Sequence, residues 1–213
     1  RPAVSDEIAH AGFGARRTSD AAPKTAWRRS PSTLEATQDL TSSPVTTIDL
    51  GAPVKDTRMV AATMRGTAWH LALRVLIQRP ERVAQLRAAT GLSNATLKEI
   101  EAQAALLTAW LSERGYDRLH FELPLQERAA DGSETNAIVD CLAEGPFGVL
   151  IIDHKSGACP DPEARFATYL PQLTAYADLV RQNWPEKRLD GIAINWMSAG
   201  TLSVSTIAEE ARV

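Results

Sequence analysis

Residues 138–157 read IVDCLAEGPFGVLIIDHKSG, two apolar runs joined by a Gly-Pro-Phe-Gly segment. Apolar runs of this length around a glycine-containing turn predict a β-hairpin. If residues 145–148 form its loop, Glu144 pairs with Val149. The antiparallel ladder then places Asp140 directly opposite Asp153. Lys155 lies two residues after Asp153 and therefore shares its face of the strand.

This register predicts a site for a divalent cation. Directly opposed side chains have Cβ atoms about 4.5–5.5 Å apart. Two carboxylates at about 5 Å repel by roughly 3 kcal/mol at an effective dielectric near 20, and a cation removes that cost. Oxygen ligands suit Mg²⁺, with Mn²⁺ as an alternative. We expect Asp140, Asp153 and Lys155 to be catalytic. The alternative is a structural salt bridge between Lys155 and either aspartate.

The surrounding pattern predicts an α/β fold. Helical periodicity followed by glycine or proline predicts helices before the hairpin, and period-two alternation in RLHFELPLQER predicts a further strand that extends it to a three-stranded antiparallel meander. A helix and two more strands follow, and Pro171 is expected to be the true start of that helix. We expect a mixed sheet flanked by helices, with helices near 58–78, 80–90, 93–114 and 171–184, strands near 118–128, 134–143 and 149–157, and two further strands within 189–207.

The first 57 residues have a different composition from the rest. They are rich in Ser, Thr and Pro and show no sustained apolar period. Such a segment buries too little apolar surface to offset its chain entropy. We therefore expect residues 1–57 to be a partly disordered arm or linker and 58–213 to be the folded domain. Because the chain begins with Arg1, we expect it to be part of a longer protein.

Charge and composition narrow the possible functions. A net charge of −3 argues against a protein that binds nucleic acid through a broad basic surface, so metal ions or a partner would supply positive field. Two isolated cysteines, Cys141 and Cys159, predict neither a zinc site nor a disulfide framework. No apolar run is long enough to span a membrane. We expect a soluble, cytoplasmic protein with no membrane partner.

Several short motifs occur in a recognisable order. They are Gly66-x-x-x-His70, Glu122 in FELPL, Asp140 after AIV, Asp153-His154-Lys155 after LII, and Gln172-x-x-x-Tyr176. The set, which covers about residues 60–207, resembles the RecB-like branch of the PD-(D/E)XK nuclease clan. Within that branch it is similar to the carboxy-terminal nuclease domain of AddA-type helicase-nuclease subunits. The resemblance implies a restriction-endonuclease-like core.

The resemblance also implies roles for individual residues. His70, Asp140 and Asp153 would bind the metal, and Lys155 would be the catalytic lysine. The substrate-binding pair would be Gln172 and Tyr176, which contact DNA or support the site. An auxiliary role falls to Glu122, which lies opposite Asp140 only if the loop around residues 131–132 has an odd number of residues.

The function implied is that of a Mg²⁺-dependent, exonuclease-type domain that degrades single-stranded DNA during double-strand-break repair by recombination. Its partners would be an upstream helicase motor in the same polypeptide and a second helicase-nuclease subunit. Two cysteines cannot hold the four-cysteine iron-sulfur cluster of some relatives, and no ATP-binding glycine-lysine loop occurs in this sequence. The alternatives are a stand-alone or phage-type nuclease of the same clan, an inactive nuclease fold that serves as an interaction module, and a purely structural α/β domain.

Overall fold

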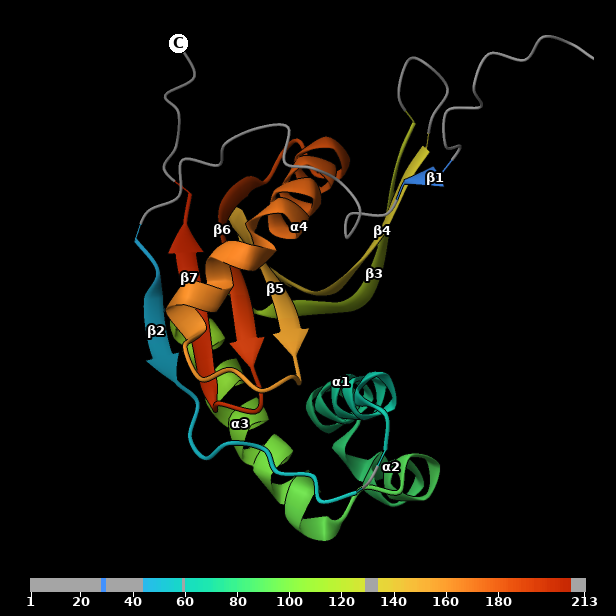
Figure 1. Ribbon diagram of the computed structural model, residues 1–213. Coiled ribbons are helices and arrows are strands. Elements are labelled where there is room, and N and C mark those ends of the chain that lie inside the picture. The colour runs from blue at the N-terminus through green and yellow to red at the C-terminus, as the bar shows by residue number, and fades with distance from the viewer. Residues whose placement is uncertain (1–27, 30–43, 59, 129–133, 208–213) are drawn as a thin grey trace, which may run out of the picture.

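The computed structural model describes residues 28–29, 44–58, 60–128 and 134–207. Its centre is a mixed seven-stranded sheet with helices on both faces, so the expected α/β class is confirmed (Figure 1). The strand order is β1-β4-β5-β6-β7-β2, and β3 pairs with β4. The strands are β1 (Arg28–Arg29), β2 (Thr46–Asp49), β3 (Arg118–Arg128), β4 (Glu134–Glu144), β5 (Gly148–Lys155), β6 (Arg188–Trp196) and β7 (Thr201–Thr206). The helices are α1 (Ala62–Gln78), α2 (Val83–Thr90), α3 (Asn94–Glu113) and α4 (Pro162–Asn183), with a 3₁₀ turn at Pro80–Arg82.

Alternation along the central strands builds two cores. Val149 and Ile151 of β5 face α4, whereas Leu150 and Ile152 face α3. In β6, Ile192, Ile194 and Trp196 share one face, as predicted. They belong to the same core cluster as Phe166 and Leu173 of α4. A third cluster joins α1, α2 and α3. The predicted antiparallel meander is present as β3-β4-β5, and α4 connects β5 to the parallel strand β6.

The predicted domain boundary at residue 57 is too late. Residues 46–49 form β2, which pairs antiparallel with β7, and Leu50 and Val54 are buried in the core. The stretch PVTTIDL contains four consecutive β-branched residues, which favour a strand. The run is short, and it is held by pairing with β7. β1 likewise pairs with β4. The predicted disorder of residues 1–27 and 30–43 falls outside the described residues.

The predicted helix start at Pro171 is wrong. α4 is continuous from Pro162, and Asp161 caps it by accepting a hydrogen bond from the amide of Ala164 (3.0 Å). A proline inside a helix removes one hydrogen bond at a cost of about 3 kcal/mol. Phe166 and Leu173, on either side of Pro171, are both buried in the same core cluster. Tertiary packing on both halves therefore holds the helix through the proline.

A buried ion pair fastens the chain before α1 to the helical cluster. Asp56 accepts hydrogen bonds from the Arg58 guanidinium (Nη2 2.6 Å, Nε 2.9 Å) and from the indole N–H of Trp69 (3.2 Å). Arg58 also donates to the carbonyl of Thr90 at the end of α2. The Arg58 hydrogen bond lowers the pKa of Asp56 to about 2, against the desolvation that would raise it. This network determines where α1 begins.

We predict that Asp56→Asn lowers the free energy of unfolding by roughly 2 kcal/mol at pH 7, the equivalent of a pKa fall from 3.8 to about 2. A lowered folded-state pKa contributes stability above the unfolded-state value. The difference should therefore shrink as pH falls from 4 to 2. Urea denaturation at several pH values measures it, with the exposed Asp117→Asn as a control. A pH-independent difference would contradict the electrostatic origin.

Candidate active site

The hairpin register brings the two predicted carboxylates to one place. β4 and β5 pair from Glu144↔Val149 to Cys141↔Ile152, as the four-residue loop predicts. The next pair in the ladder would be Asp140 and Asp153. Instead, the carboxylate of Asp140 accepts a hydrogen bond from the backbone N–H of His154 (2.8 Å). The two strands part at this point, and the polar groups lie where they separate.

Asp153 is a buried carboxylate with partners on both oxygens. Its Oδ2 lies 2.7 Å from Lys155 Nζ, and its Oδ1 accepts a hydrogen bond from Gln172 Nε2 (3.2 Å). Burial, with a smaller contribution from the charge of Asp140, raises the pKa of Asp153 to about 7 against the opposing effect of Lys155. The repulsion expected between the two carboxylates is therefore present, and Lys155 compensates only part of it.

α4 supports Asp153 from the other side. Gln172 donates to Asp153 and also lies 2.7 Å from the hydroxyl of Tyr176, one helical turn later. Tyr176 is 7% exposed and belongs to the core under α4. Burial raises its pKa to about 12. Of the two roles expected for this pair, the structure favours support of the site, because a ring buried in this way cannot stack on a base.

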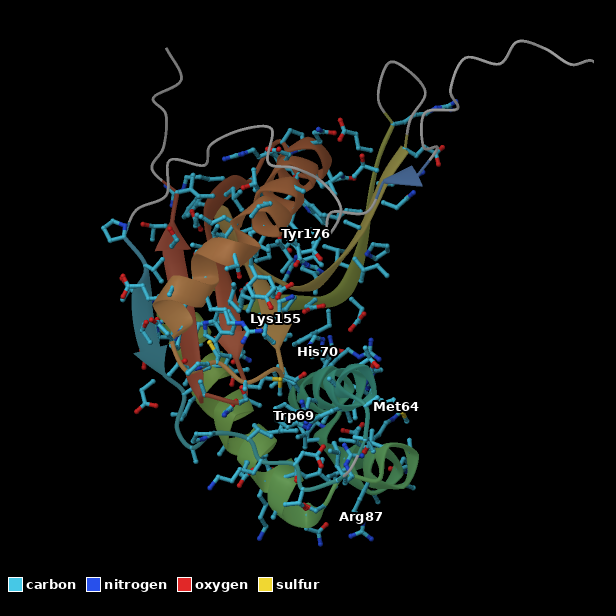
Figure 2. All side chains as sticks on the ribbon, viewed as in Figure 1. Met64, Trp69, His70, Arg87, Lys155 and Tyr176 are labelled. Atoms are coloured by element: carbon cyan, nitrogen blue, oxygen red, sulfur yellow. The ribbon has the colours of Figure 1, made fainter. Side chains whose placement is uncertain are left out.

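Lys155 has a second neighbour that the sequence motifs do not contain. Its Nζ lies 4.5 Å from the ring centroid of Tyr169, whose ring in turn meets Trp196 edge-on at 5.8 Å. An ammonium over an aromatic face is held by the ring quadrupole. Figure 2 shows Tyr176, Lys155 and His70 gathered between α4 and α1. The only sequence signal for Tyr169 was its position one helical turn before Gln172.

His70 comes to the site from α1. Its Nδ1 lies 3.6 Å from Asp140 Oδ2, and its ring meets that of His154 edge-on at 5.7 Å. Gly66, one turn earlier, faces the end of β5, where an added Cβ would lie 3.0 Å from Ser156 Oγ. The glycine therefore lets α1 approach β5 closely enough for His70 to reach Asp140, which gives the Gly-x-x-x-His spacing a physical reason.

His154 is buried, with 2% of its surface exposed, and lies between Asp153 and Lys155 in the sequence. Asn195 of β6 contacts its Nδ1 (3.2 Å), and Phe121 stacks on the ring at 6.4 Å. Burial lowers the pKa of His154 to about 4, so the imidazole is neutral at pH 7. Asn195 was not identified from the sequence, because only the parallel pairing of β5 with β6 places it beside His154.

Glu122 lies opposite Asp140, as the odd loop length required. The register runs from Phe121↔Cys141 to Leu123↔Val139 and, at the loop, Arg128 pairs with Glu134, which leaves the five residues 129–133 between the strands. Glu122 has φ of +52°, in the left-handed region that side chains other than glycine seldom adopt. Such a conformation costs about 1–3 kcal/mol and is held by its surroundings. Here it occurs beside a candidate catalytic carboxylate.

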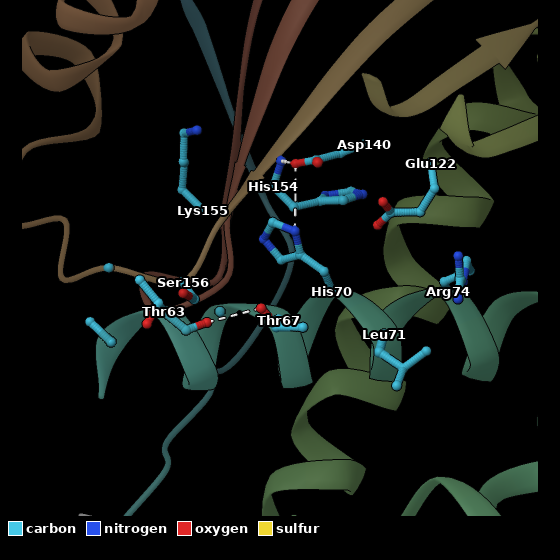
Figure 3. Close-up of a pocket in the computed structure, with 13 residues that line it drawn as sticks. Thr63, Thr67, His70, Leu71, Arg74, Glu122, Asp140, His154, Lys155 and Ser156 are labelled. Atoms are coloured by element: carbon cyan, nitrogen blue, oxygen red, sulfur yellow. Dashed lines mark hydrogen bonds and ion pairs between the residues drawn. The ribbon is translucent and has the colours of Figure 1, made fainter. Parts of the chain in front are cut away.

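These groups border an open pocket of about 850 Å³ between α1 and the ends of β4 and β5 (Figure 3). Its lining includes four ionisable or hydroxyl groups absent from the motifs: Thr63, Thr67, Arg74 and Ser156. Of the predicted site residues, it is also lined by His70, Glu122, Asp140 and Lys155. Asp153, Gln172 and Tyr176 lie behind this surface.

Comparison with known proteins identifies the fold family. A family model described as the PD-(D/E)XK nuclease superfamily matches residues 45–203. The chain belongs to this superfamily. The matched range includes the predicted site residues Asp140, Asp153 and Lys155. The match also begins at residue 45, in agreement with β2 as part of the domain.

Further comparisons with this PD-(D/E)XK domain gave distant matches. No curated protein matches the sequence. Among solved structures, 21 chains match. One, a crystal structure described as "Putative exonuclease" from Eubacterium rectale, is 14% identical with a TM-score of 0.44. The alignment covers 73% of this chain and 62% of that chain, so this chain spans less than two thirds of its length.

The expected metal-ligand set is only partly assembled. Within the described residues, no three His, Cys, Asp or Glu side chains are grouped as a metal site. His70 and Asp140 adjoin, whereas Asp153 is turned toward Lys155 and Gln172. The donor types nonetheless suit a hard divalent cation, because carboxylate oxygens and an imidazole nitrogen are ligands that Mg²⁺ or Mn²⁺ accepts. The raised pKa of Asp153 records the electrostatic cost that a cation would remove.

We predict that Asp153→Asn removes a pH dependence from the stability of the metal-free PD-(D/E)XK domain. Because the folded-state pKa of Asp153 is raised to about 7, its stabilising protonated form is lost as pH rises from 4 through 7. Wild type should therefore lose stability over that range relative to the variant. Thermal unfolding in EDTA measures this, and parallel curves for the two proteins would contradict it.

Proposed function

We propose that this domain is a metal-dependent DNA nuclease that hydrolyses phosphodiester bonds. The observation that carries the proposal is the meeting of Asp140, Asp153 and Lys155 where β4 and β5 separate, with Asp140 and Lys155 lining a pocket of about 850 Å³. A structural salt bridge between Lys155 and Asp153 would not require β4 and β5 to separate at this point. It would also not require the strained backbone of Glu122 opposite Asp140.

The residues of the chain have distinct parts in this reaction. His70, Asp140, Asp153 and the main-chain carbonyl of His154 would hold Mg²⁺ or Mn²⁺. The metal would polarise a phosphoryl oxygen and lower the pKa of a bound water. Lys155 places a positive charge beside the carboxylates, where an ammonium can orient the attacking water or neutralise charge that develops on the phosphate. Gln172 fixes the orientation of Asp153 through Oδ1.

The context of the reaction follows from the order of motifs and from charge. We propose that the substrate is single-stranded DNA, cleaved exonucleolytically, and that a helicase motor delivers it at double-strand breaks during recombinational repair in the cytoplasm. The AddA-like order of Gly66/His70, Glu122, Asp140, Asp153/Lys155 and Gln172/Tyr176 supports this. A net charge of −3 also fits, because a domain that is fed by a motor and a second subunit need not capture DNA alone.

We predict that Asp153→Asn and Lys155→Met each lower the rate of single-stranded DNA hydrolysis in Mg²⁺ by at least about 100-fold, the loss typical when one charged catalytic group is removed. Gel electrophoresis of a labelled oligonucleotide measures the rate, with and without EDTA. Asp178→Asn is the matched control, because this α4 aspartate pairs with Arg181 and does not line the pocket.

Each outcome distinguishes the candidates. Loss of cleavage in both variants and in EDTA, with the control unchanged, supports the nuclease. Equal activity of Asp153→Asn and wild type would refute the assigned chemistry. Absence of any Mg²⁺-dependent cleavage by wild type, in the full-length protein with its partners, would favour the inactive interaction module instead.

A further inference from the structure

Two strands continue beyond the sheet on the pocket side. β5 pairs with β4 only at residues 141–144, whereas β3 pairs with β4 along its whole length. Residues 122–128 of β3 and 134–140 of β4 therefore form an extension, here called the β3–β4 ribbon, which is two-stranded except where β1 pairs with residues 134–135. Figure 1 shows it running past α1, with α4 on its other side. Its inner face packs in the α4 core through Leu125, Ala137 and Val139.

The outer face of the ribbon starts at the candidate active site. It carries Glu122 and Asp140 first, then the directly paired Pro124 and Ile138, and then Gln126 paired with Asn136. One step along this face is two residues, about 6–7 Å. The apolar pair therefore lies next to the candidate catalytic carboxylates. Ile138 is 57% exposed, and Pro124 is also exposed. Their neighbours on the same face are polar: Glu122 and Gln126 on β3, and Asn136 and Asp140 on β4.

A positively charged side chain lies on the α1 side of the pocket. Arg74 of α1 lines the same pocket as Glu122, and Figure 3 shows it on the helix below Glu122. Thr63 lines the pocket near the other end of the helix, eleven residues and about 16 Å away. The pocket is therefore longer than one nucleotide, and Arg74 lines it together with Glu122. Pro124 and Ile138 lie outside this lining, one step further along the ribbon from Glu122 and Asp140.

We propose that Pro124 and Ile138 receive a nucleobase of the DNA strand as it passes the carboxylates, and that Arg74 binds a neighbouring phosphate. The inference rests on the proposed nuclease function and specifies its substrate. An aliphatic surface accepts the apolar face of any base, and a guanidinium suits a phosphate. In a duplex that face is covered by stacking, so the arrangement selects single strands.

The patch is too small for a protein partner. Specific protein interfaces bury about 800 Å² on each side, far more than two side chains provide. The positive charge of Arg74 and the exposed apolar pair instead match an extended, negatively charged chain bearing flat apolar groups. Nucleic acid combines these properties.

Binding of two oligonucleotides tests the assignment. One is a fluorescein-labelled ten-nucleotide oligodeoxythymidylate, and the other is a chain of the same length made of abasic residues. All proteins carry Asp153→Asn to prevent cleavage. Ile138→Ser is expected to weaken binding of the thymidylate roughly three- to tenfold and to leave binding of the abasic chain unchanged. Ile138→Thr, which keeps the β-branched shape, is expected to fall between.

Arg74→Gln is expected to weaken both oligonucleotides equally and to reduce the slope of log K against log salt by about 0.7, the value for one phosphate contact to a single strand. Phe147→Ser is the matched control. Phe147 is 81% exposed at the β4–β5 hairpin tip, at the opposite end of β4, and its replacement should change neither affinity.

Other results would overturn the proposal. If Ile138→Ser changes neither affinity, or lowers both equally, no base contacts this pair, while the nuclease function stands. If Ile138→Ser instead changes the concentration dependence of sedimentation, the face binds a second copy of the chain. If the Asp153→Asn protein binds neither oligonucleotide, this proposal fails, and Mg²⁺-dependent cleavage of single-stranded DNA by the wild type decides the nuclease proposal separately.

Discussion

The site depends on one exchange of hydrogen bonds at the point where β4 and β5 separate. The backbone amide of His154 donates to the carboxylate of Asp140 instead of to a carbonyl of β4. A buried amide must find an acceptor, and here a side chain provides it. The ladder therefore ends without an orphaned donor, and Asp140 is fixed beside Asp153. Every other feature of the site is arranged around this pair.

Burying Asp153 beside the half-buried carboxylate of Asp140 requires compensation, and the surrounding elements supply only part of it. Lys155 and Gln172 each partner one oxygen of Asp153. Isolated buried charge is costly, and the pKa of Asp153 stays near 7 because these partners do not offset burial and the charge of Asp140 completely. The uncompensated cost of burying Asp153 and the left-handed backbone of Glu122 both lower the stability of the fold at the candidate active site.

The helical cluster determines whether His70 can take part. α1 packs on α3, and the network of Asp56, Arg58 and Trp69 fixes the chain that leads into it. Gly66 then allows the close approach to Ser156. The stability of a distant ion pair and the geometry of the site are thus linked through the position of one helix. The outer face of the β3–β4 ribbon extends the same site in the other direction, because it begins with Glu122 and Asp140.

The sequence by itself determined the elements and the hairpin register, because period-two alternation and a four-residue loop are local properties. They placed Asp140 beside Asp153 and, through the odd loop, Glu122 opposite Asp140. Only the tertiary structure decided what depends on distant neighbours. β2 exists because β7 pairs with it, α4 continues through Pro171 because both halves are buried, and Tyr169 and Asn195 join the site through α4 and β6. Packing, which acts between residues far apart in the chain, overrides local propensity at each of these positions.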